Sequence, residues 1–109
     1  MGSMSFDFNK IKRTFMTVKL KDGRKLIVKQ PMKKTFEKIT AVQDVDESKI
    51  GIDEAMDIFG GLCAEILSNN MKDEKVSVDY MTGNYDIEEM KVFVEQFMEF
   101  VSGLGNDPN

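Results

Sequence analysis

The stretch TFMTVKLKDGRKLIVK, residues 14–29, decides the fold, because it has the pattern of two short strands around a tight turn. Residues 14–20 and 25–29 are rich in apolar and β-branched side chains, which favour strands. Asp22-Gly23 lies between them, and Asp-Gly between alternating apolar residues is a strong hairpin signal. The sequence therefore predicts an antiparallel hairpin. Because an isolated hairpin is only marginally stable in water, it needs another element to pack against.

Two registers compete for this hairpin, and they bury different faces. A two-residue loop at Asp22-Gly23 places Lys25 beside Leu20. A three-residue loop, with Gly23 left-handed, gathers the apolar residues on one face: Met16, Val18, Leu20, Leu26 and Val28. A slip of one residue reverses the buried face, so we expect the apolar pattern to select the three-residue loop. The opposite face then carries Thr17, Lys19, Lys25 and Lys29, with Ile27 as the apolar exception.

Two helices are predicted after the hairpin. Pro31 suits the first turn of a helix that continues to about residue 46. Its apolar residues at helical spacing are Met32, Phe36, Ile39 and Val42 or Val45. A second helix, from about residue 53 to residue 68, has the apolar stripe Met56, Phe59, Leu62, Cys63, Ile66 and Leu67. It contains Gly60-Gly61, and each glycine costs roughly 1 kcal/mol relative to Ala. We therefore expect a bend or the close approach of a neighbouring element there.

The connection and the last helix complete the fold. Residues 71–85 are a connection with one short helical turn that Gly83 stops. Asp86, with Glu89 three residues later, has the pattern of a reciprocal N-terminal cap for a helix that ends near Ser102. The sequence thus predicts one mostly helical α+β domain, residues 13–105, in which an N-terminal β-hairpin is followed by three main α-helices.

The apolar face of the last helix is unusually wide. At about 100° per residue, its apolar side chains span an arc of roughly 160°. A helix that packs on a core needs little more than about 100°. The excess lies at the edge formed by Phe93, Phe100 and Leu104. Either the hairpin and the second helix cover this face between them, or it binds a partner. The candidate partner-binding residues are Phe93, Phe97, Phe100 and Leu104.

The lysines of the hairpin form a second candidate binding face. Residues 1–38 contain eleven Lys/Arg and three Asp/Glu, whereas residues 39–109 contain four and sixteen. Lys19, Lys25 and Lys29 can contact nucleic-acid phosphates, an acidic protein surface or the acidic helices of another copy, or they can be solvated charges that deter edge-to-edge pairing. Because aromatic and basic residues do not interleave, nucleic acid is the weaker expectation.

Length and composition fit a single globular domain. The chain has 109 residues, of which 41% are hydrophobic and 31% charged. Residues 1–12 are interpreted as a tag remnant, Met1-Gly2-Ser3, and a flexible arm that becomes ordered only if the rings of Phe6 and Phe8 dock. No apolar run approaches the roughly 20 residues of a membrane-spanning helix, and the N-terminus lacks the pattern of a secretory signal. We therefore expect no membrane association and a cytoplasmic location.

The residue types present argue against catalysis. The chain has one cysteine, Cys63, and no histidine, which excludes an internal disulfide and a Cys/His zinc cluster. It lacks the commonest general base at neutral pH. No Gly-rich phosphate loop, nucleophile elbow or metal-ligand spacing occurs. We expect a non-catalytic, protein-binding chain without cofactors; a carboxylate-based enzyme is the alternative.

The order of the elements resembles the small tail assembly chaperones of long-tailed (siphovirus-type) bacteriophages and prophages of Gram-positive bacteria. The resemblance lies in the hairpin at residues 18–29, in Pro31 with its Phe-containing helix, and in the acidic half. That half ends in Ile87-Glu88-Glu89 through Phe97-Met98-Glu99-Phe100-Val101. The resemblance implies a protein of the bacterial host cytoplasm that binds the tape-measure protein, prevents its aggregation and recruits tail-tube subunits. It implies no catalytic residues and defines no binding motif.

Besides the carboxylate-based enzyme, two other interpretations remain open. A structural or adaptor protein of a phage particle would stay in the virion. A small nucleic-acid-binding protein would use the basic hairpin. Self-association is compatible with either, since the basic hairpin of one copy can meet the acidic helices of the next.

Overall fold

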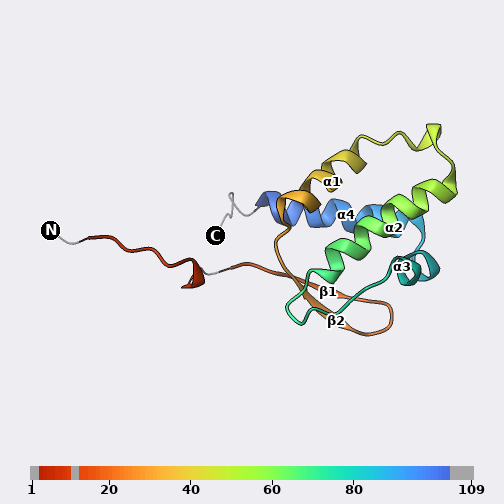
Figure 1. Ribbon diagram of the computed structural model, residues 1–109. Coiled ribbons are helices and arrows are strands. Elements are labelled where there is room, and N and C mark those ends of the chain that lie inside the picture. The colour runs from red at the N-terminus through yellow and green to blue at the C-terminus, as the bar shows by residue number, and fades with distance from the viewer. Residues whose placement is uncertain (1–2, 11–12, 104–109) are drawn as a thin grey trace.

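The structure is a computed structural model that describes residues 3–10 and 13–103 (Figure 1). Its elements are η1 (Phe8–Lys10), β1 (Met16–Lys19), β2 (Lys25–Val28), α1 (Lys33–Gln43), η2 (Glu47–Lys49), α2 (Ile52–Ser68), α3 (Val78–Asn84) and α4 (Ile87–Ser102). The described chain is therefore α+β and mostly helical, as predicted. It has four α-helices, one more than the three main helices expected. The fourth helix is α3, at the place of the predicted short helical turn; it includes Gly83 and ends one residue later, at Asn84, so the predicted stop at Gly83 is off by one residue.

The hairpin adopts the predicted register. Val18 pairs with Leu26 across a three-residue loop. Gly23 has a φ of 95°, the left-handed conformation that glycine adopts without a steric penalty. The apolar face is buried or half-buried along its length: Met16, Val18, Leu20, Leu26 and Val28. Ile27, on the other face, is 45% exposed.

The two strands differ in what lies beside them. Backbone hydrogen bonds of 3.0 and 2.9 Å join Ile27 and Lys29 to residues 69–71, which extend the sheet beyond β2. Successive residues of a strand direct their backbone groups to alternate sides. Ile27 directs its backbone groups toward residues 69–71, so Thr17, which lies opposite Ile27, directs its own backbone groups away from β2. Lys19, two residues further along β1, does the same. No described segment pairs with Thr17 or Lys19, so β1 is the free edge of the sheet.

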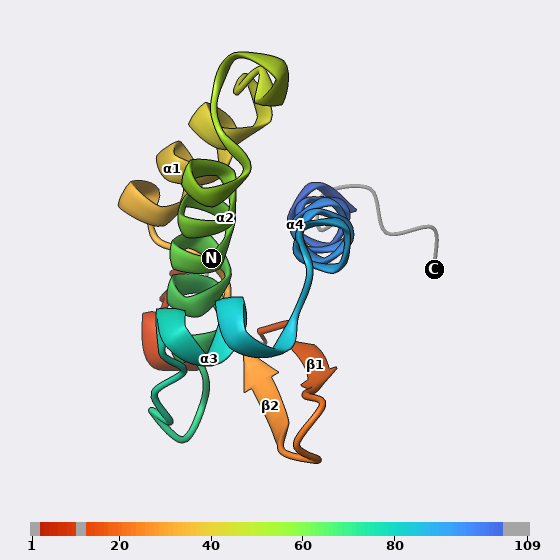
Figure 2. The ribbon, with the colours of Figure 1, turned by 90° about the vertical axis from the view of Figure 1, so that its right-hand side faces the viewer.

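Helix α2 is the centre of the core, and it contacts α1, α3, α4 and β2. Figure 2 shows α1 and α3 beside α2, with α4 lying across from them above the hairpin. The predicted stripe of α2 is confirmed, because its members are buried or, for Met56, half-buried: Met56, Phe59, Leu62, Cys63, Ile66 and Leu67.

Gly60 allows α3 to lie close to α2. A Cβ added at Gly60 would lie 2.6 Å from the Thr82 Cγ2, whereas a Cβ at Gly61 would meet nothing within 4 Å. The expected close approach is confirmed at Gly60. Gly61 has no such contact, and nothing in the structure explains why a glycine stands there.

Helix α1 packs against the core through fewer residues than the helical spacing of its apolar residues predicted. It begins at Lys33, so Pro31 precedes the helix and does not lie in its first turn as predicted. Ile39 is fully buried, but Phe36 is exposed and Met32 is 74% exposed. Ion pairing supplements this small contact: Glu65 of α2 accepts a hydrogen bond of 2.6 Å from Thr35 Oγ1 and lies 2.7 Å from Lys38 Nζ.

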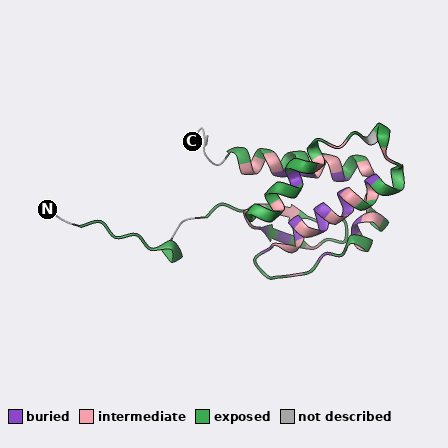
Figure 3. Ribbon diagram, turned by 45° about the horizontal axis from the view of Figure 1, so that its top comes forward, coloured by how far each residue is buried: buried purple, intermediate pink, exposed green. Residues whose placement is uncertain are grey.

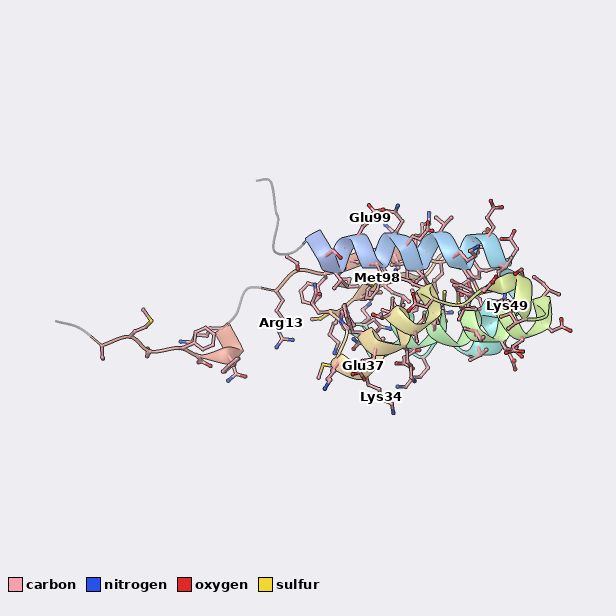
Figure 4. All side chains as sticks on the ribbon, turned by 90° about the horizontal axis from the view of Figure 1, so that it is seen from above. Arg13, Lys34, Glu37, Lys49, Met98 and Glu99 are labelled. Atoms are coloured by element: carbon pink, nitrogen blue, oxygen red, sulfur yellow. The ribbon has the colours of Figure 1, made fainter. Side chains whose placement is uncertain are left out.

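Helix α4 has the predicted reciprocal cap. The Asp86 carboxylate accepts from the Glu89 N–H at 2.8 Å, and the Glu89 carboxylate accepts from the Asp86 N–H at 2.9 Å. Met90, Val94 and Phe97 are buried in the core. Figure 4 shows Met98 on the side of α4 that faces α1 and Glu99 on the opposite side. The wide apolar face therefore turns toward the rest of the fold.

The N-terminal arm, residues 3–10, extends away from the helices and the hairpin (Figures 1 and 3). Phe6 and Phe8 are 69% and 73% exposed and contact each other edge to face at 4.8 Å. The hydrogen bonds of the arm also stay within it. In this structure the two rings are thus undocked.

Candidate protein-binding site

A hollow of about 160 Å³ lies between the end of β1 and the first half of α4. We call it the β1–α4 groove. It is lined by Val18, Lys19, Leu20, Leu67, Met81, Tyr85, Glu89, Met90 and Phe93. Val18 and Leu20 come from the apolar face of the hairpin, and Phe93 comes from the apolar face of α4. An apolar hollow with a few polar groups at its rim is typical of a binding site.

The open edge of β1 borders the groove. Thr17 and Lys19 direct backbone N–H and C=O groups outward there, and Figure 2 shows α4 above the hairpin on the β1 side. An unpaired strand edge is a template for an added strand. Edge and groove together offer main-chain hydrogen bonds and a recess for alternate side chains, the two requirements for binding an extended peptide.

Lys21 joins the hairpin turn to two residues of the groove lining, Tyr85 and Glu89. Its Nζ lies 2.8 Å from a Glu89 carboxylate oxygen and donates to the Asn84 carbonyl at 2.8 Å. Its backbone N–H donates to the Tyr85 hydroxyl at 2.9 Å. The Lys21 ammonium, followed by the Asp86 N–H, lowers the pKa of Glu89. Glu89 is therefore charged at neutral pH and already committed to Lys21 and to the helix cap.

Tyr85 forms part of the groove wall. The Lys21 ammonium lies 4.7 Å from the centre of its ring, within the range of a cation–π contact. Burial, with a contribution from the neighbouring Tyr80, raises the pKa of Tyr85 to about 12. The hydroxyl is therefore protonated at neutral pH.

Two of the seven residues singled out from the sequence line the same groove. Lys19 and Phe93 line the β1–α4 groove from opposite sides. Phe100 is half-buried against the core, with its ring 5.9 Å from that of Phe97. Phe97 is only 1% exposed, so it packs inside the fold and is not on the surface where a partner would meet it. Leu104 lies outside the described residues.

The remaining lysines lie elsewhere on the hairpin. Lys25 faces Lys19 across the strands and lines a separate hollow with Ile27 and Met71, while Lys29 lies at the entry to α1. Among the described residues, Lys19, Lys25 and Lys29 take part in no ion pair. The register thus produces a positively charged outer face that folding does not neutralise.

The sequence did not indicate that Val18, Tyr85 and Glu89 line the groove, or that Lys21 contacts the last two. Val18 was recognised only as a residue of the core face. The pairing of Lys21 with Glu89 joins residues 68 positions apart, so no local pattern indicates it. Only the placement of α4 against the hairpin reveals it.

Cys63 is buried in α2, where its Sγ lies 3.7 Å from the Met90 carbonyl. Burial raises the pKa of this thiol to about 12. Within residues 3–10 and 13–103, no cluster of His, Cys, Asp or Glu is arranged to hold a metal ion. In the same part of the chain, no helix combines the length and apolar character needed to cross a membrane.

Protein-family models, curated proteins and solved structures were all compared with this chain, and none matches it.

Proposed function

We propose that this chain is a non-catalytic protein-binding module and that the β1–α4 groove is its binding site. The observation that carries the proposal is the position of the free β1 edge directly beside an apolar hollow containing Phe93. A partner segment in extended conformation would add a strand to β1 and place alternate apolar side chains in the hollow. The carboxylate in the lining, Glu89, is held by Lys21, which suits a structural role better than proton transfer.

The partner we propose follows from the resemblance to tail assembly chaperones. It is an extended, apolar segment of the long, otherwise helical tape-measure protein of a phage tail, with tail-tube subunits as further partners, in the cytoplasm of a bacterial host. The groove supports this proposal only by offering a surface for an apolar, aggregation-prone segment. A particle-bound adaptor would use the same surface, and detection of the chain in purified particles distinguishes the adaptor from the chaperone.

Co-expression with the products of neighbouring genes, above all any long helix-rich one, tests the proposal. Phe93→Ser removes the apolar wall of the groove, and Val92→Ser is its matched control because Val92 is exposed on the same helix. Thr17→Pro is an independent test: it removes an N–H that points out of the sheet, a strand position that tolerates proline.

We expect the wild type and Val92→Ser to keep the partner in the supernatant, whereas Phe93→Ser and Thr17→Pro lose it. Thermal unfolding of each variant shows whether its fold is intact. Equal retention by all four proteins, or the absence of any co-purifying protein, would contradict the proposal. Co-purification of nucleic acid that depends on Lys19 and Lys25 would replace it with the nucleic-acid alternative.

A further inference from the structure

The N-terminal arm has the pattern of a strand that lacks a sheet. Met4, Phe6 and Phe8 alternate with Ser5, Asp7 and Asn9, and strict alternation is typical of a half-buried strand. All three apolar side chains of the arm are strongly exposed. The arm thus has an apolar face with nothing to cover it, while the same chain has a free strand edge, β1, with an apolar hollow beside it.

We infer that the arm of a second copy of this chain binds along the free edge of β1 and occupies the β1–α4 groove. This inference names one occupant of the groove and therefore rests on the proposed role of the groove as a binding site. Residues that lie opposite each other in a sheet point to the same face. Phe6 and Phe8 would share the apolar face of Val18 and Leu20, and Asp7 would share the outer face of Thr17 and Lys19.

Charge favours this pairing. The register places Lys19 directly opposite Lys25, and like charges in that position destabilise a sheet. Neither lysine has an ion-pair partner among the described residues. An added strand would bring the carboxylate of Asp7 to the other side of Lys19. Asp7 bonds only within the arm, to Asn9 and to Lys10, and these exposed bonds can be exchanged for bonds to β1.

The size of the hollow matches an aromatic ring. A dry cavity of about 150 Å³ lined by apolar side chains binds benzene. The β1–α4 groove has about 160 Å³ and is lined mainly by apolar side chains. It therefore has room for one of the two phenylalanine rings of the arm, and the second would lie against the exposed flank of α4.

The arm of the same chain is a poorer occupant. To reach its own β1 edge, the chain would have to reverse within residues 10–15, KIKRTF, which contain no Gly, Pro, Asn, Asp or Ser. In addition, the Gln30 side chain donates to the Thr14 carbonyl at 3.3 Å and to the Thr14 hydroxyl at 3.2 Å, which fixes the direction in which the chain leaves β1. A second copy avoids the reversal and allows a reciprocal, closed exchange of arms.

Cysteine cross-linking between differently tagged copies tests the inference. Asp7→Cys in one copy is mixed with Lys19→Cys in the other under mild oxidation. Cβ atoms of opposite residues on paired strands lie about 4.5–5.5 Å apart, close to disulfide range. Lys25→Cys is the matched control, because Lys25 shares the outer face but lies one strand, about 5 Å, further from the edge. The native Cys63 is buried and does not interfere.

We expect the Asp7→Cys and Lys19→Cys mixture to form a mixed disulfide dimer, of twice 12.4 kDa before the tags, at least fivefold more than the Lys25→Cys control. Phe6→Ser with Phe8→Ser should abolish both the cross-link and a dimer of the unmodified chain in analytical ultracentrifugation. Both rings are strongly exposed and lie outside the core, so we expect the fold to be unaffected.

Two results would overturn the inference. An intrachain disulfide in the Asp7→Cys, Lys19→Cys double variant, without mixed dimers, would assign the groove to the chain's own arm. Cross-linking no greater than that of the control would show that the arm does not bind there. Either result leaves partner capture through Phe93 and Thr17 intact, so failure of the arm inference is distinguishable from failure of the proposed function.

Discussion

The adjacent glycines of α2 allow a sharp test of the packing, because alanine should have opposite effects at the two positions. Gly61→Ala places a Cβ in open space. Replacing a helix-interior glycine by alanine is worth about 0.5–1 kcal/mol, since glycine loses more backbone entropy on folding. We expect Gly61→Ala to stabilise the protein by about that amount.

Gly60→Ala gains the same entropy but creates a clash. Its Cβ would lie 2.6 Å from the Thr82 Cγ2, with the Val78 Cγ1 at 3.5 Å. Thr82 cannot turn away freely, because its hydroxyl donates to the Val78 carbonyl at 3.1 Å and its χ1 is restricted in a helix. Overpacking typically costs about 1–3 kcal/mol. Gly60→Ala should therefore be less stable than Gly61→Ala by about 1–3 kcal/mol.

Urea and thermal unfolding followed by circular dichroism measure this difference, and 1 kcal/mol corresponds to about 4–8 °C in Tm for a small domain. Thr82→Ser supplies the control, because it removes the clashing methyl group but keeps the hydroxyl. In a double-mutant cycle, Thr82→Ser should recover most of the penalty of Gly60→Ala. If Gly60→Ala stabilises as much as Gly61→Ala, or if Thr82→Ser recovers nothing, α3 does not lie against α2 as described.

Two further predictions concern polar contacts. Asn70 is only 1% exposed, donates to the Leu67 and Glu74 carbonyls and accepts from the Lys72 and Glu74 N–H groups. Asn70→Ala should therefore cost about 2–4 kcal/mol in urea unfolding, and a loss below about 1 kcal/mol would contradict this account. Hydrogen bonds from Lys38 and Thr35 lower the pKa of Glu65, so the ionised carboxylate stabilises the fold above its ordinary pKa of 4.5. The stability lost in Glu65→Gln, up to about 1 kcal/mol for such a pair, should be present at pH 7 and vanish as the pH falls through the lowered pKa. A difference that does not change with pH would exclude this explanation.

Features specified by residues close together in sequence could be predicted. The hairpin register follows from the alternation of Val18, Leu20 and Leu26 around Asp22-Gly23, because only one of the two registers gathers these side chains on one face, with Ile27 left on the other. The cap of α4 follows from Asp86 and Glu89, whose side chains and backbone satisfy each other within one turn. In both cases the local free energy and the tertiary fold favour the same conformation.

Features that depend on what covers a face could not be predicted. Helical spacing placed Met32 and Phe36 on one side of α1, but α2 reaches only Ile39 and its neighbours, which leaves the first turn of the helix exposed. Gly83 was expected to stop a turn, and α3 continues one residue past it to Asn84, while Val78 and Thr82 of this helix pack on Gly60.

The candidate site could not be predicted either, because it depends on which elements of the fold lie side by side. Lys19 and Phe93 were both singled out, but nothing in the sequence places them on one groove. Their proximity requires the contact between the hairpin turn and α4 that Lys21 and Glu89 make. The width of the α4 face indicated Phe93 and Phe97 alike and could not distinguish Phe97, which is core, from Phe93, which lines the groove.

The division of charge along the chain has two separate roles in the fold. Lys21, Arg24 and Lys38 each lie within 4 Å of an acidic side chain from the second half, so part of the basic segment holds the hairpin and α1 to the acidic helices. The lysines of the outer hairpin face do not. Charges on an exposed edge discourage indiscriminate pairing but admit a strand that brings an opposite charge. An edge that carries Lys19 and borders an apolar groove is therefore selective: it favours a segment that places a carboxylate between aromatic side chains, as Phe6, Asp7 and Phe8 of the arm do.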